Sequence, residues 1–318
     1  MSFKVKSIAS FVLFLGFISQ SVAGILTEAS TGMSNYSLLV TGDANLGNGV
    51  HIHGGAYIGG DLTLTGGNTS VGSDLVNADL GLYIGGSALS NQRIDLMSNN
   101  YYIGGSNNAI LQNAGTELSI APALPLSPAA MAAVLLAKSN ELYGMGDYGV
   151  AVDASDFNRV QIDLTAGAMN VVHWDSSNAA FLSAYANLQF NNFTDDTFLI
   201  INYDLTTALD FRAKNEFIPS LAYGNVIWNF VGGENLNITN SVSTFKGSIL
   251  ATDSSVDWNA NDIDGQLVAK SLTWNNTSQS HHYIPWTPAE KKDIPEPASI
   301  AIFSLGLLGL LANRKRLS

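Results

Sequence analysis

Short apolar runs separated by glycine pairs dominate the first third of the chain. One tetrapeptide, Tyr-Ile-Gly-Gly, occurs three times, beginning at Tyr57, Tyr83 and Tyr102, at offsets of 26 and 19 residues. Residues 61–65 alternate between polar and apolar, which places Leu62 and Leu64 on one face of a strand and the threonines on the other. Strand units that recur at about 20 residues are typical of stacked β-coils. The pattern therefore predicts a β-solenoid.

The glycine pair after each of these tyrosines marks the corner where one coil closes. Because glycine reaches positive φ without steric cost, we expect left-handed backbone at these corners. The three tyrosines would then occupy equivalent places on successive coils. The uneven spacing leaves a second arrangement open, a β-sandwich with glycine-rich hairpins, in which the tyrosines have no stacking relation.

From residue 150 onward the pattern is again that of strands. Residues 160–164 alternate, whereas residues 198–201 are all apolar, as in a strand buried on both faces. Two similar segments contain Gly247 and Gly265, which are 18 residues apart. We interpret these two segments as successive coils.

A helix is predicted between the two β-rich parts. Ser127 is a favourable N-cap and Pro128 suits the first helical position. Residues 129–143 are rich in Ala, Leu and Met, and Gly144 follows as a C-cap. We expect this helix to pack along the flank of the solenoid.

The N-terminus has the organisation of a secretory signal peptide. Lys4 and Lys6 precede an apolar stretch at residues 8–18, and a small-residue cleavage site ends at Ala23. Cleavage there makes Gly24 the first mature residue. The apolar stretch is too short to span a bilayer comfortably.

The C-terminus combines a short motif, an apolar stretch at residues 300–312 and a basic end. The apolar stretch is about 13 residues long, shorter than the roughly 20 of a relaxed transmembrane helix. Its basic end should stay cytoplasmic. The motif and the basic end consist of Pro295, Glu296, Pro297, Arg314, Lys315 and Arg316. A plain membrane anchor remains an alternative.

The succession of a Pro-Glu-Pro motif, a short apolar stretch and a basic end resembles the PEP-CTERM sorting signal of Gram-negative bacteria. The resemblance implies recognition and cleavage by an exosortase, contact with the membrane only before processing, and release to the cell surface or extracellular matrix. We therefore expect a signal peptide at 1–23, a β-solenoid domain at 24–290, a linker at 291–294 and a sorting signal at 295–318.

Charge and composition exclude several classes of protein. The chain has 14 basic and 26 acidic residues and no cysteine. Residues 24–294 retain 9 basic against 25 acidic residues, a net charge of −16. Such a surface disfavours non-specific nucleic-acid binding, which needs cationic side chains. Without cysteine there is no disulfide, thiolate metal site or cysteine nucleophile.

Two segments match cofactor or metal motifs in part, but they lack the neighbouring elements or residues that binding requires. Residues 144–149 match G-x-G-x-x-G, but they follow a helix, so we expect a helix-ending turn and no dinucleotide. The segment from Asp257 begins like a calcium loop without its central glycine. The aspartates at positions 253, 257, 262 and 264 could still bind calcium weakly at the surface, or form Asx turns. We expect no other cofactor.

The histidines and the search for catalytic motifs give little support for a metal site or for enzymatic catalysis. His51 and His53 share one strand face, but a metal site needs three or four converging ligands, so we predict none unless His281 and His282 approach. No G-x-S-x-G elbow is present. We therefore expect no enzymatic activity. A polysaccharide-active β-helix enzyme is the alternative.

The segments 36–44 and 58–62 resemble the opening of the choice-of-anchor A domain, and 247–251 with 264–269 resemble its closing pattern. The closing pattern is also similar to bacterial ice-binding domains. This resemblance spans residues 30–285. It implies a mainly β fold, a right-handed β-solenoid (β-helix) with one long helix on its flank, and an adhesive role with no established catalytic residues.

Polysaccharide is the partner that we expect for such a surface. Trp258 and Trp274 lie among asparagines, so we expect them to be exposed and to stack on a ligand, whereas Trp228 should be buried. The predicted function is a non-enzymatic, exported surface or matrix protein. An ice-binding protein is the alternative, although Thr63 and Thr65 form the only Thr-x-Thr pair.

Overall fold

The computed structural model describes residues 35–75, 79–122, 126–156, 158–215, 223–239, 244–275 and 279–282. The predicted cleavage site at Ala23 and Gly24, the linker and the sorting signal lie outside these residues. The chain divides into two units, residues 1–287 and 288–318. Everything described below belongs to the first unit.

The unit is mainly β, and its strands are almost all parallel. The largest sheet has 13 strands. Nine of them follow one another as β13 (Met169–Trp174), β15 (Phe198–Asp204), β17 (Val226–Val231), β20 (Ser248–Trp258), β22 (Leu267–Trp274), β1 (Tyr36–Val40), β4 (Gly55–Ile58), β7 (Leu80–Ile84) and β9 (Asn100–Ile103). The other four are β16 (Leu209–Phe211), β18 (Leu236–Ile238), β2 (Ala44–Leu46) and β5 (Leu62–Leu64).

The described residues also form two smaller sheets and three helical segments. The seven-stranded sheet consists of β10 (Ile110–Gln112), β8 (Arg93–Asp95), β6 (Asn68–Val71), β3 (Val50–Ile52), β23 (Gln279–His282), β21 (Asp262–Asp264) and β19 (Thr244–Lys246). The three-stranded sheet consists of β11 (Val150–Asp153), β12 (Arg159–Leu164) and β14 (Asn187–Asn191). The helices are α1 (Pro128–Tyr143), α2 (Ala179–Leu182) and the short 3₁₀ helix η3 (Tyr223–Asn225).

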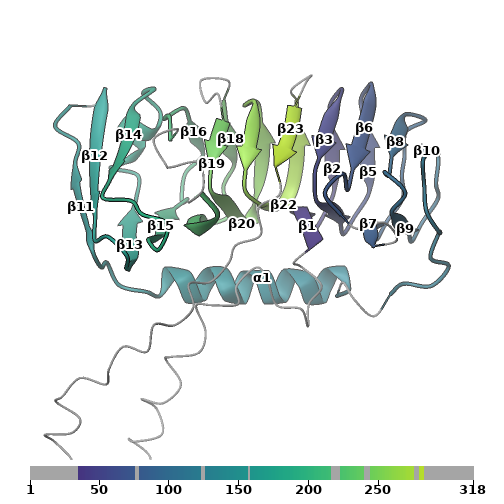
Figure 1. Ribbon diagram of the computed structural model, residues 1–318, viewed down its shortest axis with the longest axis horizontal. Helices are drawn as coiled ribbons and strands as arrows, with labels where there is room; N and C mark the ends of the chain where they lie inside the picture. Colours follow the sequence, from purple (N-terminus) through teal and green to yellow (C-terminus); the bar gives the residue numbers. More distant parts are fainter. Residues whose placement is uncertain are drawn as a thin grey trace, which may run out of the picture. The chain divides into compact units, whose positions relative to one another are not determined.

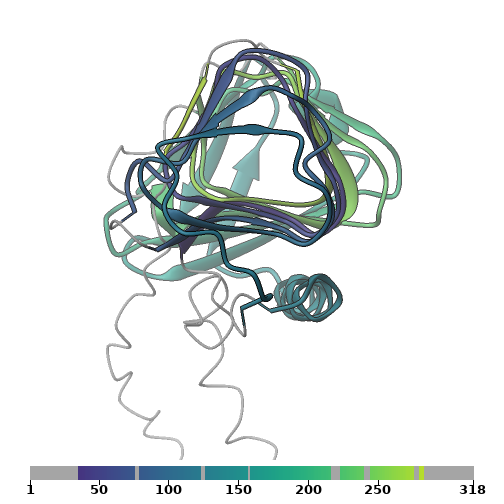
Figure 2. The ribbon, with the colours of Figure 1, turned by 90° about the vertical axis from the view of Figure 1, so that its right-hand side faces the viewer.

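Successive circuits of the chain lie in register on one another. β1, β2 and β3 form one circuit, and they pair in parallel with β4, β5 and β6 of the next circuit. In end view the circuits outline a triangle (Figure 2). The buried apolar side chains of the strands form one continuous core cluster. Among the described strand pairs, β11 with β12 is the antiparallel one. The predicted mainly β fold with parallel strands is therefore confirmed.

The order of the circuits in space differs from their order in the sequence. The first circuit lies in the middle of the stack, and the chain proceeds from there to β9 and β10 at one end. α1 then runs along the stack to the other end, where β11 to β13 begin the return (Figure 1). The last circuit meets the first one, because β22 pairs with β1 and β23 pairs with β3.

The tyrosines of the repeated tetrapeptide stack as predicted. Tyr57 lies opposite Tyr83, and Tyr83 lies opposite Tyr102, on adjacent parallel strands. The ring centroids of Tyr57 and Tyr83 are 4.6 Å apart with the planes 4° from parallel. Burial raises the pKa of the Tyr36, Tyr57 and Tyr83 phenols. The Tyr57 hydroxyl donates a hydrogen bond to the carbonyl of Leu126 (2.9 Å), just before α1.

The prediction of positive φ at the glycine corners is wrong. None of the glycines that follow Tyr57, Tyr83 and Tyr102 has positive φ. Glycine is needed there because the corners stack directly: a β-carbon at Gly85 would overlap the carbonyl oxygen of Gly59. Gly247 and Gly265, in contrast, do have positive φ, at 102° and 155°.

Small side chains hold the stacked corners in register. The Asp43 carboxylate accepts a hydrogen bond from the backbone N–H of Asp61 (2.8 Å). The Asp61 carboxylate accepts one from the N–H of Ser87 (2.7 Å), and the Ser87 hydroxyl accepts one from the N–H of Ser106 (3.1 Å). The residue after the corner glycine thus accepts a hydrogen bond from the backbone of the next circuit at three successive corners, at Asp43, Asp61 and Ser87.

α1 packs on the sheet that contains β15, β17 and β20. As predicted, Ser127 is its N-cap, Pro128 its first residue and Gly144 its C-cap, although Ser127 makes no side-chain capping bond. It buries one stripe, composed of Met131, Leu135, Ser139 and Leu142. The predicted burial of one helix side is confirmed.

A buried polar ladder attaches the C-terminal part of α1. Asn202 and Asn229 lie in register on β15 and β17, and His173 of β13 continues the row. The Asn202 amide donates to the Leu142 carbonyl (2.8 Å), and the Asn229 amide donates to the Ser139 carbonyl (2.9 Å). Carbonyl groups of the final helical turns lack partners within a helix, so Asn202 satisfies one of them.

The stacked corners predict that an added β-carbon destabilises the domain. At Gly86 it would lie 2.7 Å from the carbonyl oxygen of Gly60. We expect Gly86→Ala to lower the free energy of unfolding by about 1–3 kcal/mol, measured by urea denaturation. Gly146, which has no atom within 4 Å of the equivalent position, is the matched control. Equal stability of Gly86→Ala and Gly146→Ala would contradict close stacking as the reason for glycine.

Candidate functional site

One side of the stack carries a layer of small polar side chains. It is formed by β16, β18, the C-terminal halves of β20 and β22, β2 and β5, which pair in parallel in that order. We call this surface the polar face. Its central column has one residue from each strand, in register: Asp210, Asn237, Asp257, Thr273, Asn45 and Thr63.

Strand alternation produces the polar face. The residues on either side of each column member point inward and are buried, for example Leu62 and Leu64 beside Thr63. Successive side chains of a strand point to opposite faces, so burying the apolar set turns the polar set outward. Registered parallel strands then align these polar groups in a continuous row.

The column changes character along its length. Thr273, Asn45 and Thr63 are uncharged. At the other end, Asp210 and Asp257 flank Asn237, whose amide donates to the Asp210 carboxylate (2.7 Å). The polar face therefore has a neutral half and a charged half.

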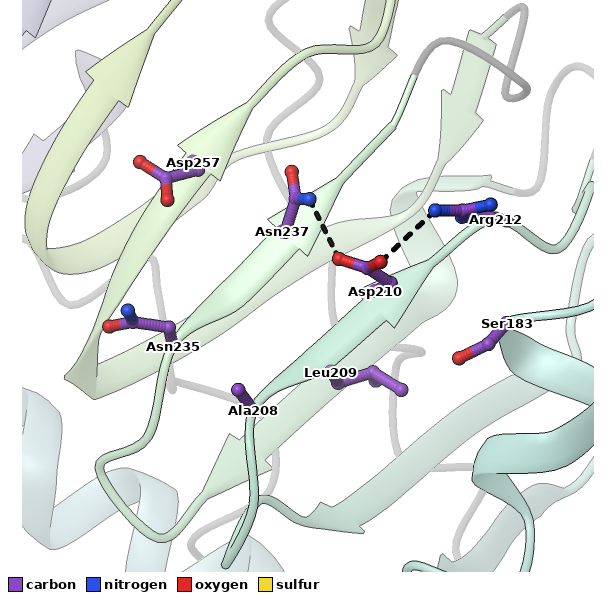
Figure 3. Close-up of a pocket in the computed structure, with 8 residues that line it drawn as sticks. All are labelled: Ser183, Ala208, Leu209, Asp210, Arg212, Asn235, Asn237 and Asp257. Carbon is purple, nitrogen blue, oxygen red and sulfur yellow. Dashed lines mark hydrogen bonds and ion pairs between the residues drawn. The ribbon is translucent and has the colours of Figure 1, made fainter.

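An open depression lies over the charged half, with a volume of about 690 Å³. Figure 3 shows the Asp210 carboxylate between Asn237 on one side and Arg212 on the other. The Arg212 guanidinium donates to Asp210 over 3.1 Å. Asp257 and Asn235 lie on the neighbouring strand and loop and complete the polar lining.

These groups can bind hydroxyl groups. Carboxylates accept hydrogen bonds, whereas amides both donate and accept, and guanidinium groups donate. The Asp210 side chain is 47% exposed and that of Arg212 is 36% exposed, so a ligand can reach both. The arrangement suits an extended, hydroxyl-rich ligand lying across several strands.

The prediction that Trp258 and Trp274 are exposed is wrong. Their exposed fractions are 0% and 1%, and their ring centroids are 5.2 Å apart in the core. Both residues point inward in phase with the buried Val256 and Leu272, and this alternation outweighs the neighbouring asparagines. They cannot stack on a ligand from inside the core. Trp228 is buried, as predicted.

The four aspartates considered for calcium do not converge. Asp253 pairs with Lys270 at 3.4 Å, and Asp264 pairs with Lys246. Asp257 belongs to the polar face instead. Within the described ranges, no three His, Asp or Glu side chains are grouped as metal ligands.

The far end of the chain does approach the first histidines. β23, which contains His281 and His282, pairs with β3. His51 Nδ1 lies 2.6 Å from the Ser70 hydroxyl, and His53 Nδ1 lies 3.3 Å from the Asp74 carboxylate. The side chains of His51 and His53 are thus hydrogen-bonded to residues that follow them by 19 and 21 positions in the chain.

Residues 144–149 form the expected turn. α1 ends at Tyr143 and β11 begins at Val150, so the glycines of this motif connect a helix to a strand. Gly149 has a positive φ of 72°.

In the part of the chain that the structure describes, no helix is both long enough and apolar enough to cross a membrane.

Sequence reasoning missed the polar face. Its members are separated by long intervals, and no local motif marks them. Aligning the circuits on the glycine corners would have identified part of the column, because Asn45 follows Gly42 and Thr63 follows Gly60, each by three residues. Asp210 follows no glycine corner, and Asn237 follows the Gly232-Gly233 pair at a different interval, so only the strand pairing brings them into the row.

The fold and this surface define a mainly β domain of parallel strands with an exposed polar sheet. The chain belongs to the family described as "Putative Ice-binding-like adhesive domain", whose model matches residues 29–282. Residues 293–316 match the PEP-CTERM protein-sorting motif. No curated protein matches the chain.

Three solved structures resemble the chain distantly. An ice-binding protein from an Antarctic biological consortium is 13% identical, with 80% of this chain and 90% of that chain covered and a TM-score of 0.33. One from the Antarctic ascomycete Antarctomyces psychrotrophicus is 11% identical, with 78% and 94% covered and a TM-score of 0.30. The glycosylated ice-binding protein of an Arctic yeast is 11% identical, with 83% and 98% covered and a TM-score of 0.30.

Substitutions at inward and outward positions of β22 should differ strongly in their effect on stability. Trp274→Ala should lower the free energy of unfolding by about 3–5 kcal/mol, because it leaves a large cavity in the core. Thr273→Ala, one residue away on the polar face, should change it by less than about 0.5 kcal/mol. Urea denaturation of both variants tests this. A small effect at Trp274 would place that side chain at the surface.

Proposed function

We propose that this protein is a non-enzymatic, exported surface or extracellular-matrix protein that adheres through its polar face. The observation that carries the proposal is the presence, in one chain, of an adhesive-family domain and a PEP-CTERM sorting motif. The polar face supports it further, because a row of hydroxyl, amide and carboxylate groups can contact an extended polysaccharide.

We infer that the adhesive domain is a right-handed β-solenoid with α1 on its flank, similar to the choice-of-anchor A domain. The registered parallel circuits support this inference, as do the stacked Tyr57, Tyr83 and Tyr102. The proposed extent is residues 24–290, after a signal peptide at 1–23 and before the linker at 291–294 and the sorting signal at 295–318.

Export and processing follow from the two ends of the chain. We propose cleavage after Ala23, passage across the inner membrane of a Gram-negative bacterium and processing by an exosortase at the sorting motif. The membrane is then a partner only before processing. A surface with a net charge of −16 over residues 24–294 should not bind nucleic acid.

We propose no catalytic residues and no resident cofactor, and at most weak calcium binding at the surface. The acidic groups of the polar face support a binding role, because Asp210 is engaged by both Arg212 and Asn237. A carboxylate held in this way presents its oxygens in fixed positions as hydrogen-bond acceptors.

The neutral half of the polar face favours one alternative function. Thr63, Asn45 and Thr273 form a row of small uncharged groups in register, which is compatible with ice binding. The family is described as ice-binding-like, which is consistent with this alternative. Thermal hysteresis of the purified exported protein distinguishes the two functions, and a clear positive result would replace adhesion by ice binding.

The adhesion proposal predicts a loss of binding when the polar face is blocked. Thr63→Arg places a long cationic side chain in the column. We expect retention of the protein on surfaces coated with extracellular polysaccharide from the producing bacterium to fall about tenfold. Gln161→Arg, on the three-stranded sheet, should bind as the unaltered protein does. Equal retention of both variants would exclude the polar face as the adhesive surface.

The sorting proposal predicts that Glu296→Ala blocks processing. The variant should accumulate as a membrane-retained form that still carries its basic end, whereas Glu290→Ala should be processed normally. Mass spectrometry of surface-released protein gives the C-terminal residue. Unaltered protein recovered outside the cell with an intact Ser318 would contradict exosortase cleavage.

A further inference from the structure

An exposed aromatic side chain contacts Arg212, one of the residues that line the depression on the polar face. Tyr185 is 55% exposed and follows α2 by three residues. The Arg212 guanidinium lies 5.5 Å from the centre of its ring, and the Tyr185 hydroxyl accepts a long hydrogen bond from Arg212 (3.5 Å). Arg212 therefore connects the tyrosine to Asp210 and to the depression.

Fold stability does not explain a tyrosine at this position. Its φ is 58°, in the left-handed region that a residue with a β-carbon adopts at a cost. Glycine would relieve that cost, and little apolar surface would be lost because most of the ring is exposed. Strained backbone of this kind is concentrated at functional sites, so the aromatic ring calls for a functional reason.

The surrounding structure holds Tyr185 in place. Before it, Phe181 and Leu182 are buried in the core, and after it Ala186 is fully buried. The Leu182 carbonyl accepts hydrogen bonds from the backbone N–H groups of Arg212 and Ala213, both at 2.8 Å. The turn that carries Tyr185 is thus fixed to the end of β16, next to Asp210.

We propose that Tyr185 and the charged half of the polar face form a saccharide-binding subsite. The ring provides a platform for the apolar face of a sugar. Asp210, Asn237 and Asp257 lie in register on three adjacent strands (Figure 3) and are partners for hydroxyl groups. This inference rests on the adhesive function proposed above and names the ligand class.

The charge of the subsite selects neutral saccharides. Two carboxylates line the depression against the single guanidinium of Arg212, and that guanidinium is already paired with Asp210. Uronate or sulfated chains would meet repulsion from Asp257 and from the acidic domain as a whole. The open shape suits an internal segment of a polysaccharide chain lying across the strands.

Calorimetric titration of the exported, processed protein with neutral hexose oligosaccharides and with oligouronates tests the proposal. We expect binding of neutral oligosaccharides and weaker or no binding of oligouronates. Tyr185→Gly should weaken neutral binding about tenfold or more while the Tm stays the same or rises, because the backbone strain is relieved. Tyr185→Phe, which keeps the ring, should retain most of the affinity.

Two further variants locate the ligand. Asp257→Ala should also weaken neutral binding, because it removes hydroxyl acceptors from the depression. Tyr148→Ala, which removes an exposed tyrosine (61%) elsewhere in the domain, should leave binding unchanged.

The outcomes separate this inference from the proposed function. Neutral binding that survives Tyr185→Gly but is lost in Thr63→Arg would overturn the subsite and leave adhesion through the polar face intact. Preference for oligouronates would overturn the ligand class. Absence of binding to any saccharide would overturn both the subsite and polysaccharide adhesion.

Discussion

The domain depends on its circuits approaching one another to the spacing of paired strands, about 4.8 Å, at the corners as well as along the strands. At the corners after Tyr57, Tyr83 and Tyr102 this leaves no room for a β-carbon, because the preceding circuit's backbone occupies that space. Glycine pairs meet the requirement, and Asp61 and Ser87, which follow two of these pairs, accept hydrogen bonds from the backbone of the next circuit. Close corner stacking therefore determines the register of everything between the corners.

The register of the circuits in turn produces two surfaces, the one that binds α1 and the polar face. On one side, Asn202 and Asn229 align as a buried polar pair and bind carbonyl groups of α1. This attachment lets α1 carry the chain from one end of the stack to the other (Figure 1). On another side, the same register aligns Asn45 and Thr63 with the rest of the polar face.

The polar face is a consequence of core packing as well as a candidate site. Each outward residue is positioned by buried neighbours in its own strand, so the row stays straight without contacts among all its members. At its charged half, hydrogen bonds from Asn237 and Arg212 fix the Asp210 carboxylate. Groups held in this way lose little freedom when a ligand binds, which favours recognition of a long, repetitive partner.

The sequence alone determined the elements that depend on local pattern: the helix bounds near Ser127 and Gly144, and the stacking of repeated tyrosines. Tertiary structure decided the rest. Corner glycines were required by contact with another circuit, which φ preferences do not reveal. Trp258 and Trp274 were buried because strand phase outweighed their asparagine neighbours. The polar face was assembled only when circuits far apart in the chain came into register, since neither the order of the circuits nor their register is encoded in any one segment.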